Sequence, residues 1–105
     1  MKVTMLVTAM LITPASQTVA QDADVEAGAA YAGQVCAACH AVLANERHSP
    51  LPQAPAFQSV ADTPGMTELA LSVWLQSSHP TMPNIILEQD DLRNVVAYIR
   101  SLKSN

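Results

Sequence analysis

The amino-acid sequence predicts an all-α domain built from three main helices and short helical turns. Apolar side chains recur at helical spacing in two segments, residues 67–77 and 89–103. Prolines mark the connections between the helical segments, and no two segments show the alternation expected of neighbouring strands. These observations favour an architecture of packed helices over a β-sheet protein.

Residues 1–20 are predicted to be a signal peptide that is removed on export. Lys2 is the only charged residue before Asp22, an apolar run extends from Val3 to Ile12, and residues 18–20 form an acceptable cleavage site. An apolar run this short does not cross a bilayer, which needs about 20 residues. We therefore expect an exported protein without stable membrane insertion, and the alternative is a buried N-terminal helix.

The remaining residues, 21–105, are predicted to form one small acidic domain. The full chain has a formal net charge of −4, and loss of Lys2 with the signal peptide leaves −5. The absence of a basic patch excludes nucleic acid as the expected partner, whereas an acidic surface favours a partner with a basic docking patch. A domain of this size buries only a modest core and is commonly stabilised further by disulfides, a metal or a large ligand.

The first helix is predicted over residues 25–39, with acidic residues at its start, where the helix dipole favours negative charge. Gly28 within it costs about 1 kcal/mol relative to alanine, which suggests that a close helix crossing requires the glycine. Residues 41–55 are predicted to be a loop because prolines interrupt them, and residues 56–61 a short helical turn.

The second main helix is predicted over residues 67–77 and the last over residues 89–103. Apolar residues including Leu69, Val73 and Trp74 give the second helix a broad stripe, typical of a helix covered on two sides. The last helix has an acidic first turn, a basic last turn and one clean apolar face. The members of that face are Leu92, Val95, Val96, Ile99 and Leu102.

The segment VCAACHAV, residues 35–42, contains the motif that carries chemistry. Cys36, Cys39 and His40 match the C-x-x-C-H pattern of haem attachment. Positions i, i+3 and i+4 share one face of a helix, so two thiols can add to the two vinyl groups of one porphyrin while the imidazole reaches the iron. We therefore predict one covalently attached haem c, with His40 as an axial ligand of the iron.

Other uses of the two cysteines are weaker alternatives. A redox C-x-x-C pair belongs near a βαβ unit, and no strand is predicted. A structural zinc ion binds four ligands, so a site with Cys36 and Cys39 would also need His48 or His79 and one further ligand. A disulfide between the two cysteines would close a tiny loop and add little stability.

The sixth ligand of the iron is predicted to be Met82. The candidate side chains are Met66, Met82, His48 and His79. A His/Met pair is a known axial set that raises the reduction potential. Pro80 and Pro83 flank Met82 and would hold it in a stiff, extended segment, which lowers the cost of placing a weak thioether on iron. Met66 is expected to pack at a helix start, and His48 to be exposed.

Several short motifs occur together in residues 21–105: Gly28 and Tyr31 before CAACH, APAF at 54–57, HPTMPN at 79–84 and VVAYIRSL at 95–102. With them the chain resembles the small single-haem class I cytochromes c of bacterial periplasms. The resemblance implies an all-α fold wrapped around haem, with the first and last helices crossing near Gly28 and Tyr98. It also implies one-electron transfer through a partly exposed haem edge, and a Pro55 carbonyl that holds the His40 ring.

Five further side chains are predicted to have supporting roles. Trp74 is expected in the core, with an indole hydrogen bond to a haem propionate as the alternative. His79 is expected to be a solvated loop residue that could pair with a propionate or replace Met82. Tyr31 and Phe57 are expected to be packing residues, as is Tyr98 at the helix crossing.

The predicted function is that of a monomeric periplasmic electron carrier, not an enzyme, with redox proteins as partners. One alternative is a haem subunit of a larger periplasmic dehydrogenase or oxidase complex. Another is a haem-based ligand sensor or peroxidase-like protein, which requires an open sixth position and is disfavoured by Met82.

Overall fold

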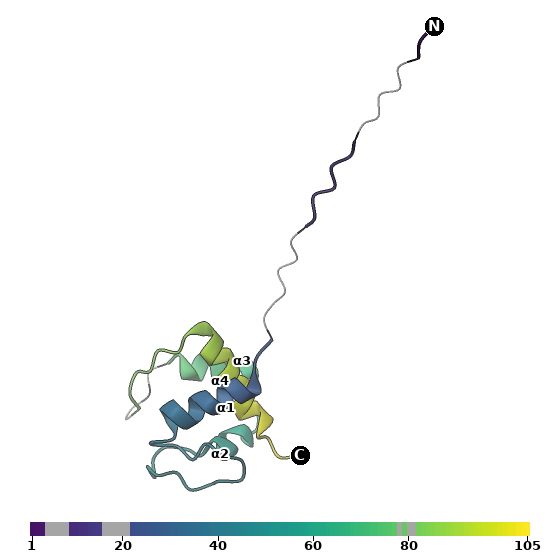
Figure 1. Ribbon diagram of the computed structural model, residues 1–105. Helices are drawn as coiled ribbons and strands as arrows, with labels where there is room; N and C mark the ends of the chain where they lie inside the picture. The colour runs from purple at the N-terminus through teal and green to yellow at the C-terminus, as the bar shows by residue number, and fades with distance from the viewer. Residues whose placement is uncertain (4–8, 16–21, 78, 80–81) are drawn as a thin grey trace.

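The computed structural model describes residues 1–3, 9–15, 22–77, 79 and 82–105, and every regular element among them is helical. The helices pack against one another (Figure 1). Residues 9–15 are extended and expose their apolar side chains, so they do not form the buried helix considered above. The proposed cleavage site at residues 18–20 lies outside the described residues.

The first predicted helix is divided into two elements and ends earlier than expected. Helix α1 (Val25–Tyr31) begins at Asp24, whose carboxylate accepts a hydrogen bond from the Ala27 N–H at 3.0 Å. It continues into η1 (Ala32–Cys36), a short π-helical segment. Residues 37–39, predicted to be helical, form a turn in which the Cys36 carbonyl accepts from the N–H groups of Cys39 and His40. Such π-helical insertions are frequent at functional sites.

Helix α4 (Gln89–Ser101) packs across α1 (Figure 1), and the two helices are in close contact at Gly28. A Cβ atom at Gly28 would lie 2.0 Å from the Asn94 carbonyl oxygen and 2.9 Å from Tyr98 Cβ, so only glycine permits this approach. The Asn94 side chain also accepts a hydrogen bond from the Asp24 N–H at 2.8 Å. The packing reason predicted for Gly28 is therefore confirmed.

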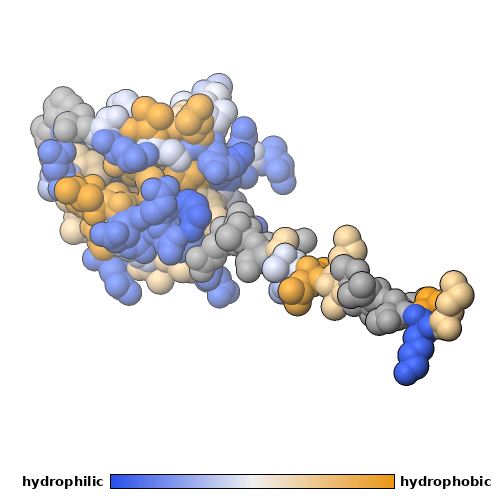
Figure 2. Space-filling model, turned by 90° about the horizontal axis from the view of Figure 1, so that it is seen from above, coloured by the Kyte–Doolittle hydropathy of each residue, from blue (hydrophilic) through white to orange (hydrophobic). Residues whose placement is uncertain are grey.

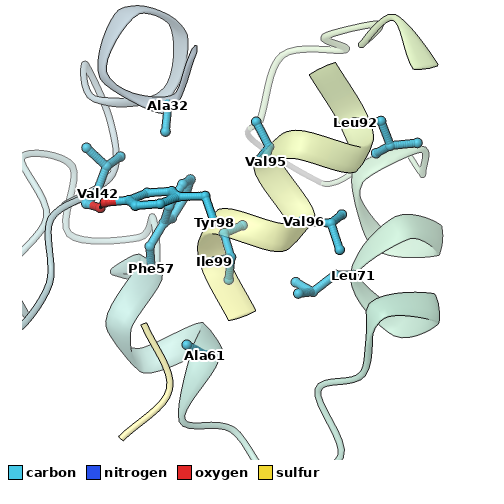
Figure 3. Close-up of a cluster of buried hydrophobic side chains, with 10 residues drawn as sticks. All are labelled: Ala32, Val42, Phe57, Ala61, Leu71, Leu92, Val95, Val96, Tyr98 and Ile99. Atoms are coloured by element: carbon cyan, nitrogen blue, oxygen red, sulfur yellow. Dashed lines mark hydrogen bonds between the residues drawn. The ribbon is translucent and has the colours of Figure 1, made fainter. Parts of the chain in front are cut away.

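The hydrophobic core lies between α4, η1 and the short helix α2 (Phe57–Ala61), with one contribution from α3 (Glu68–Leu75). Figure 3 shows its side chains converging on the inner face of α4. The buried members are Ala32, Val42, Phe57, Ala61, Leu71, Leu92, Val95, Val96, Tyr98 and Ile99. The predicted apolar face of α4 is confirmed except at Leu102, which packs against the cluster while only half-buried.

Helix α3 is less covered than its sequence predicted. Thr67 caps its start by accepting from the Ala70 N–H at 3.1 Å. Leu71 is its only fully buried residue, whereas Leu69 is 73 % exposed and Val73 56 % exposed. Trp74 is 62 % exposed, so the prediction that it is a core residue is wrong. Orange apolar side chains are visible between polar ones on the face of the domain shown in Figure 2.

A buried polar side chain fastens the end of the chain to α2. Gln58 is fully buried, donates to the Leu102 carbonyl at 2.6 Å, and accepts from the Asn45 N–H at 2.9 Å. Asp62 accepts from the Ser104 N–H at 2.8 Å. Satisfied buried polar groups of this kind fix the relative positions of the segments that they join.

Candidate cofactor site

The His40 ring is held in one orientation by a backbone carbonyl. Its Nδ1 donates to the Pro55 carbonyl oxygen at 2.6 Å, the contact implied by the family resemblance. The Phe57 ring lies beside it with a centroid separation of 5.4 Å. Because Nδ1 carries the proton, Nε2 is left with a free lone pair, the state in which an imidazole ligates a metal.

The chain on both sides of this contact is fastened to the core. The Phe57 N–H donates to the Ala41 carbonyl at 2.9 Å, and the Tyr98 hydroxyl donates to the Val42 carbonyl at 2.5 Å (Figure 3). The residues that follow His40 are therefore tied to α2 and α4. This arrangement positions the imidazole by main-chain contacts that the sequence pattern does not reveal.

Cys36 and Cys39 are both free and half-buried, Cys36 at the end of η1 and Cys39 in the turn that follows. Burial raises the pKa of the Cys36 thiol. A dithiol redox centre needs a thiol whose pKa is lowered so that it reacts as a thiolate. The environment of Cys36 therefore disfavours a dithiol redox centre. It is consistent with a protonated thiol in the apolar lining of a cavity.

Two adjoining cavities bring the predicted site residues together. The first, of about 290 Å³, has a mainly apolar wall and is close to the lower limit of about 300 Å³ for small-molecule sites. The second, of about 220 Å³, shares part of its lining with the first. His40, Pro55, Trp74 and Met82 line both cavities. The first is completed by Cys36, Phe57, Val60, Thr63, Met66, Leu71, Leu75 and Ile99, and the second by Cys39, Leu51, Gln53, Ala54, His79 and Pro83.

This donor set fits a covalently bound haem. One oriented imidazole and a thioether line both cavities, and each cavity is also bordered by one of the two thiols. A flat apolar group bound there would lie beside Trp74, which lines both cavities and is largely exposed. Among the described residues, no group of three or more His, Cys, Asp or Glu side chains could hold a metal ion. The alternative zinc site therefore has no ligand set within the described chain.

The other candidate ligands are distributed unequally around the cavities. Met66 borders the first cavity, while His48 is exposed and borders neither. Met82 is half-buried; of its flanking prolines, Pro83 is exposed and Pro80 lies outside the described residues. His79 is half-buried against Trp74 instead of solvated, which corrects its predicted environment. No sequence signal indicated that contact or the carbonyl beside the His79 ring.

Helical architecture and donor set together define an all-α haem-binding protein. The family model for cytochrome c matches residues 25–103, and the chain belongs to this family. It therefore binds haem c through the C-x-x-C-H motif and functions in haem-based electron transfer. Comparisons with curated proteins and with solved structures gave no significant match. Within the described residues, no helix is long and apolar enough to span a membrane.

Proposed function

We propose that this cytochrome c is a periplasmic carrier of single electrons whose haem iron is ligated axially by His40 and Met82. The observation that carries the proposal is that His40 and Met82 line the same two cavities, which are also bordered by the attachment cysteines. When bound, haem supplies an iron that alternates between the ferrous and ferric states.

The residues of the chain give this site its properties. The Pro55 carbonyl fixes the His40 tautomer and raises the basicity of its Nε2. A Met82 thioether opposite an imidazole favours a high reduction potential. Apolar side chains, including Phe57 and Leu71, line the first cavity together with His40 and Met82, and an apolar shell of this kind influences the reduction potential. A site closed on both axial sides favours electron transfer over ligand sensing or peroxidase-like chemistry.

The location and the partners follow from charge and from the N-terminal segment. An apolar run preceded by Lys2 supports export to the periplasm, and N-terminal sequencing of the mature protein tests it. A mature N-terminus that still contains residues 1–20 would contradict export with cleavage. The net negative charge supports a monomer that docks on redox proteins with basic patches, and salt should slow that encounter.

One structural observation favours a second candidate, a haem subunit of a larger dehydrogenase or oxidase complex. Leu69 and Val73 lie one helical turn apart on α3 and are both largely exposed. Exposed apolar side chains that are grouped on one face of a helix are a feature of protein–protein contact sites. Purification from the native membrane-free extract distinguishes the two: a carrier elutes alone, and a subunit elutes with its enzyme.

The axial ligation is tested by matched methionine variants, because Met66 and Met82 both line the first cavity. Met82→Ala should abolish the weak red-edge absorption of the iron–thioether bond in the ferric protein and lower its reduction potential. Met66→Ala should retain both and lose only packing, about 2 kcal/mol or more if its side chain becomes enclosed. Loss of the absorption in the Met66 variant alone would overturn the assignment.

A further inference from the structure

His79 is held in the wall of the second cavity by two contacts. Its Nδ1 donates to the Ser77 carbonyl oxygen at 2.6 Å. Its ring meets the Trp74 ring almost perpendicularly, at 84° and with a centroid separation of 4.2 Å. A half-buried imidazole fixed on two sides is not a freely solvated loop residue.

The second ring nitrogen of His79 has no hydrogen-bond partner. Its Nε2 is buried and unpaired with respect to the part of the chain that the structure describes. A carbonyl oxygen can only accept, so Nδ1 carries the proton, and the neutral ring keeps a lone pair on Nε2. A buried acceptor without a partner is destabilising, and such a group commonly has a functional explanation.

His40 and His79 share this arrangement. In both rings Nδ1 lies 2.6 Å from a backbone carbonyl oxygen, that of Pro55 for His40 and that of Ser77 for His79. Metal-ligating histidines almost always donate their second nitrogen in this way, which leaves the other nitrogen free for the metal. Both rings also border the second cavity, together with Met82.

We propose that His79 is a reserve axial ligand, which binds the haem iron through Nε2 when Met82 leaves it. The proposal rests on Met82 being the resting ligand. In the exchange one iron–sulfur bond breaks and one iron–nitrogen bond forms, with no change in electron count. In the neutral ring with its proton on Nδ1, Nε2 can bind the iron without loss of a proton. Since Nε2 is enclosed at rest, the exchange includes a movement of the His79 ring.

The exchange would give the protein two coordination states with different properties. A thioether ligand raises the potential of a haem relative to a second nitrogen ligand, so the His40/His79 state is the poorer electron acceptor. Both states close the sixth position to small ligands. A hydrogen bond from His79 to a haem propionate is the competing explanation; it would require a proton on Nε2 and hence a cationic ring.

Four variants of the haem-loaded protein test the proposal, with ferric electron paramagnetic resonance, azide titration and the reduction potential as measurements. They are Met82→Ala, Met82→Ala with His79→Gln, Met82→Ala with His48→Gln, and His79→Gln alone. His48 is the matched control because it is exposed and borders neither cavity. Glutamine retains an amide N–H that can still donate to the Ser77 carbonyl.

We expect Met82→Ala to be low-spin with two nitrogen ligands and to bind azide weakly. Adding His79→Gln should make the iron high-spin and raise the azide affinity at least tenfold, whereas adding His48→Gln should change neither. His79→Gln alone should retain the iron–thioether absorption of the wild type, because His79 does not bind the iron at rest.

Three outcomes would overturn the reserve-ligand proposal. If Met82→Ala is already high-spin while the wild type shows the iron–thioether absorption, His79 is not a reserve ligand, and the assignment of Met82 as the resting ligand is retained. If His79→Gln alone makes the iron high-spin, His79 is the resting ligand and the Met82 assignment fails too. If His79→Gln alone shifts the potential with unchanged coordination, the ring pairs with a propionate.

Discussion

The two ends of the core are built differently. At the crossing of α1 and α4 the polypeptide supplies its own packing, since Ala32 is completely buried and Val95 is 1 % exposed. Around α3 and the segment that contains Met82, apolar side chains border two cavities, and Trp74 is largely uncovered. The sequence composition is apolar on both sides, so hydrophobicity alone does not distinguish them.

This difference identifies haem as a packing partner as well as a redox group. The helix crossing is closed by main chain against main chain at Gly28, where no further group fits. The cavity side is closed only when an apolar group fills the space between His40 and Met82. We therefore expect stability at the crossing to be a property of the polypeptide, and stability on the cavity side to depend on the cofactor.

Preventing haem attachment should have the largest effect and should separate the two regions. We expect the Cys36→Ala/Cys39→Ala chain to lose haem on acid–acetone extraction and to be mostly unfolded by circular dichroism, because its small core lacks the largest apolar group. Any remaining hydrogen-exchange protection should lie in α1 and α4. Cooperative unfolding of the haem-free chain, with α3 protected as strongly as α4, would contradict the dependence on cofactor.

The Gly28→Ala variant tests the packing at the crossing of α1 and α4. A methyl group there would overlap the Asn94 carbonyl, and backbone atoms cannot move aside easily, so we expect a loss of about 3 kcal/mol in the free energy of unfolding. Gly33→Ala is the matched control, because a Cβ at Gly33 would contact nothing within 4 Å. Denaturant titration of both haem-loaded variants measures the difference, and equal losses would disprove a close crossing.

The sequence predicted the crossing of α1 and α4 more accurately than the cavity region around α3 and Met82. The 3.6-residue repeat of α4 and the single glycine at position 28 depend only on contacts between helices, and both describe the structure correctly. The broad stripe of α3 was misinterpreted because periodicity cannot tell a face covered by protein from a face left for a cofactor or for solvent. Trp74 is the clearest case of this ambiguity.

The site was predictable where a motif or a local sequence feature marks its residues. Cys36, Cys39 and His40 form a fixed motif, and the family resemblance implied the Pro55 carbonyl beside His40. The Ser77 carbonyl beside His79 belongs to the main chain and had no residue signal. The turn after Cys36 was also missed, because alanines at 37 and 38 favour a continuing helix. Loop residues that meet through backbone contacts require the three-dimensional structure.

Tyr98→Phe should have a moderate effect on the link between the closed side and the His40 loop. Removal of the hydroxyl leaves the buried Val42 carbonyl without this donor, and we expect a loss of about 1–2 kcal/mol in the free energy of unfolding. Tyr31→Phe is the control, since no hydrogen bond of its hydroxyl occurs within the described part of the chain. Equal denaturation midpoints for the two variants would show that the Tyr98 contact does not hold the loop.

The smallest effect concerns acid stability at the C-terminal fastening of α2. The Ser104 backbone N–H and the Gln58 side chain, with smaller help from Arg47, lower the pKa of Asp62 from 3.8 to about 2. A lowered pKa means that the folded state resists protonation, so this contribution is complete above pH 3.8 and is lost as the pH falls through about 2. In urea titrations at several pH values, Asp62→Asn should lose less stability than the wild type over that range. The control is Asp22→Asn, which changes an exposed carboxyl outside the helices and should show the same acid dependence of stability as the wild type. If Asp62→Asn also lost as much stability in acid as the wild type, the Asp62 contacts would not be the cause of that loss.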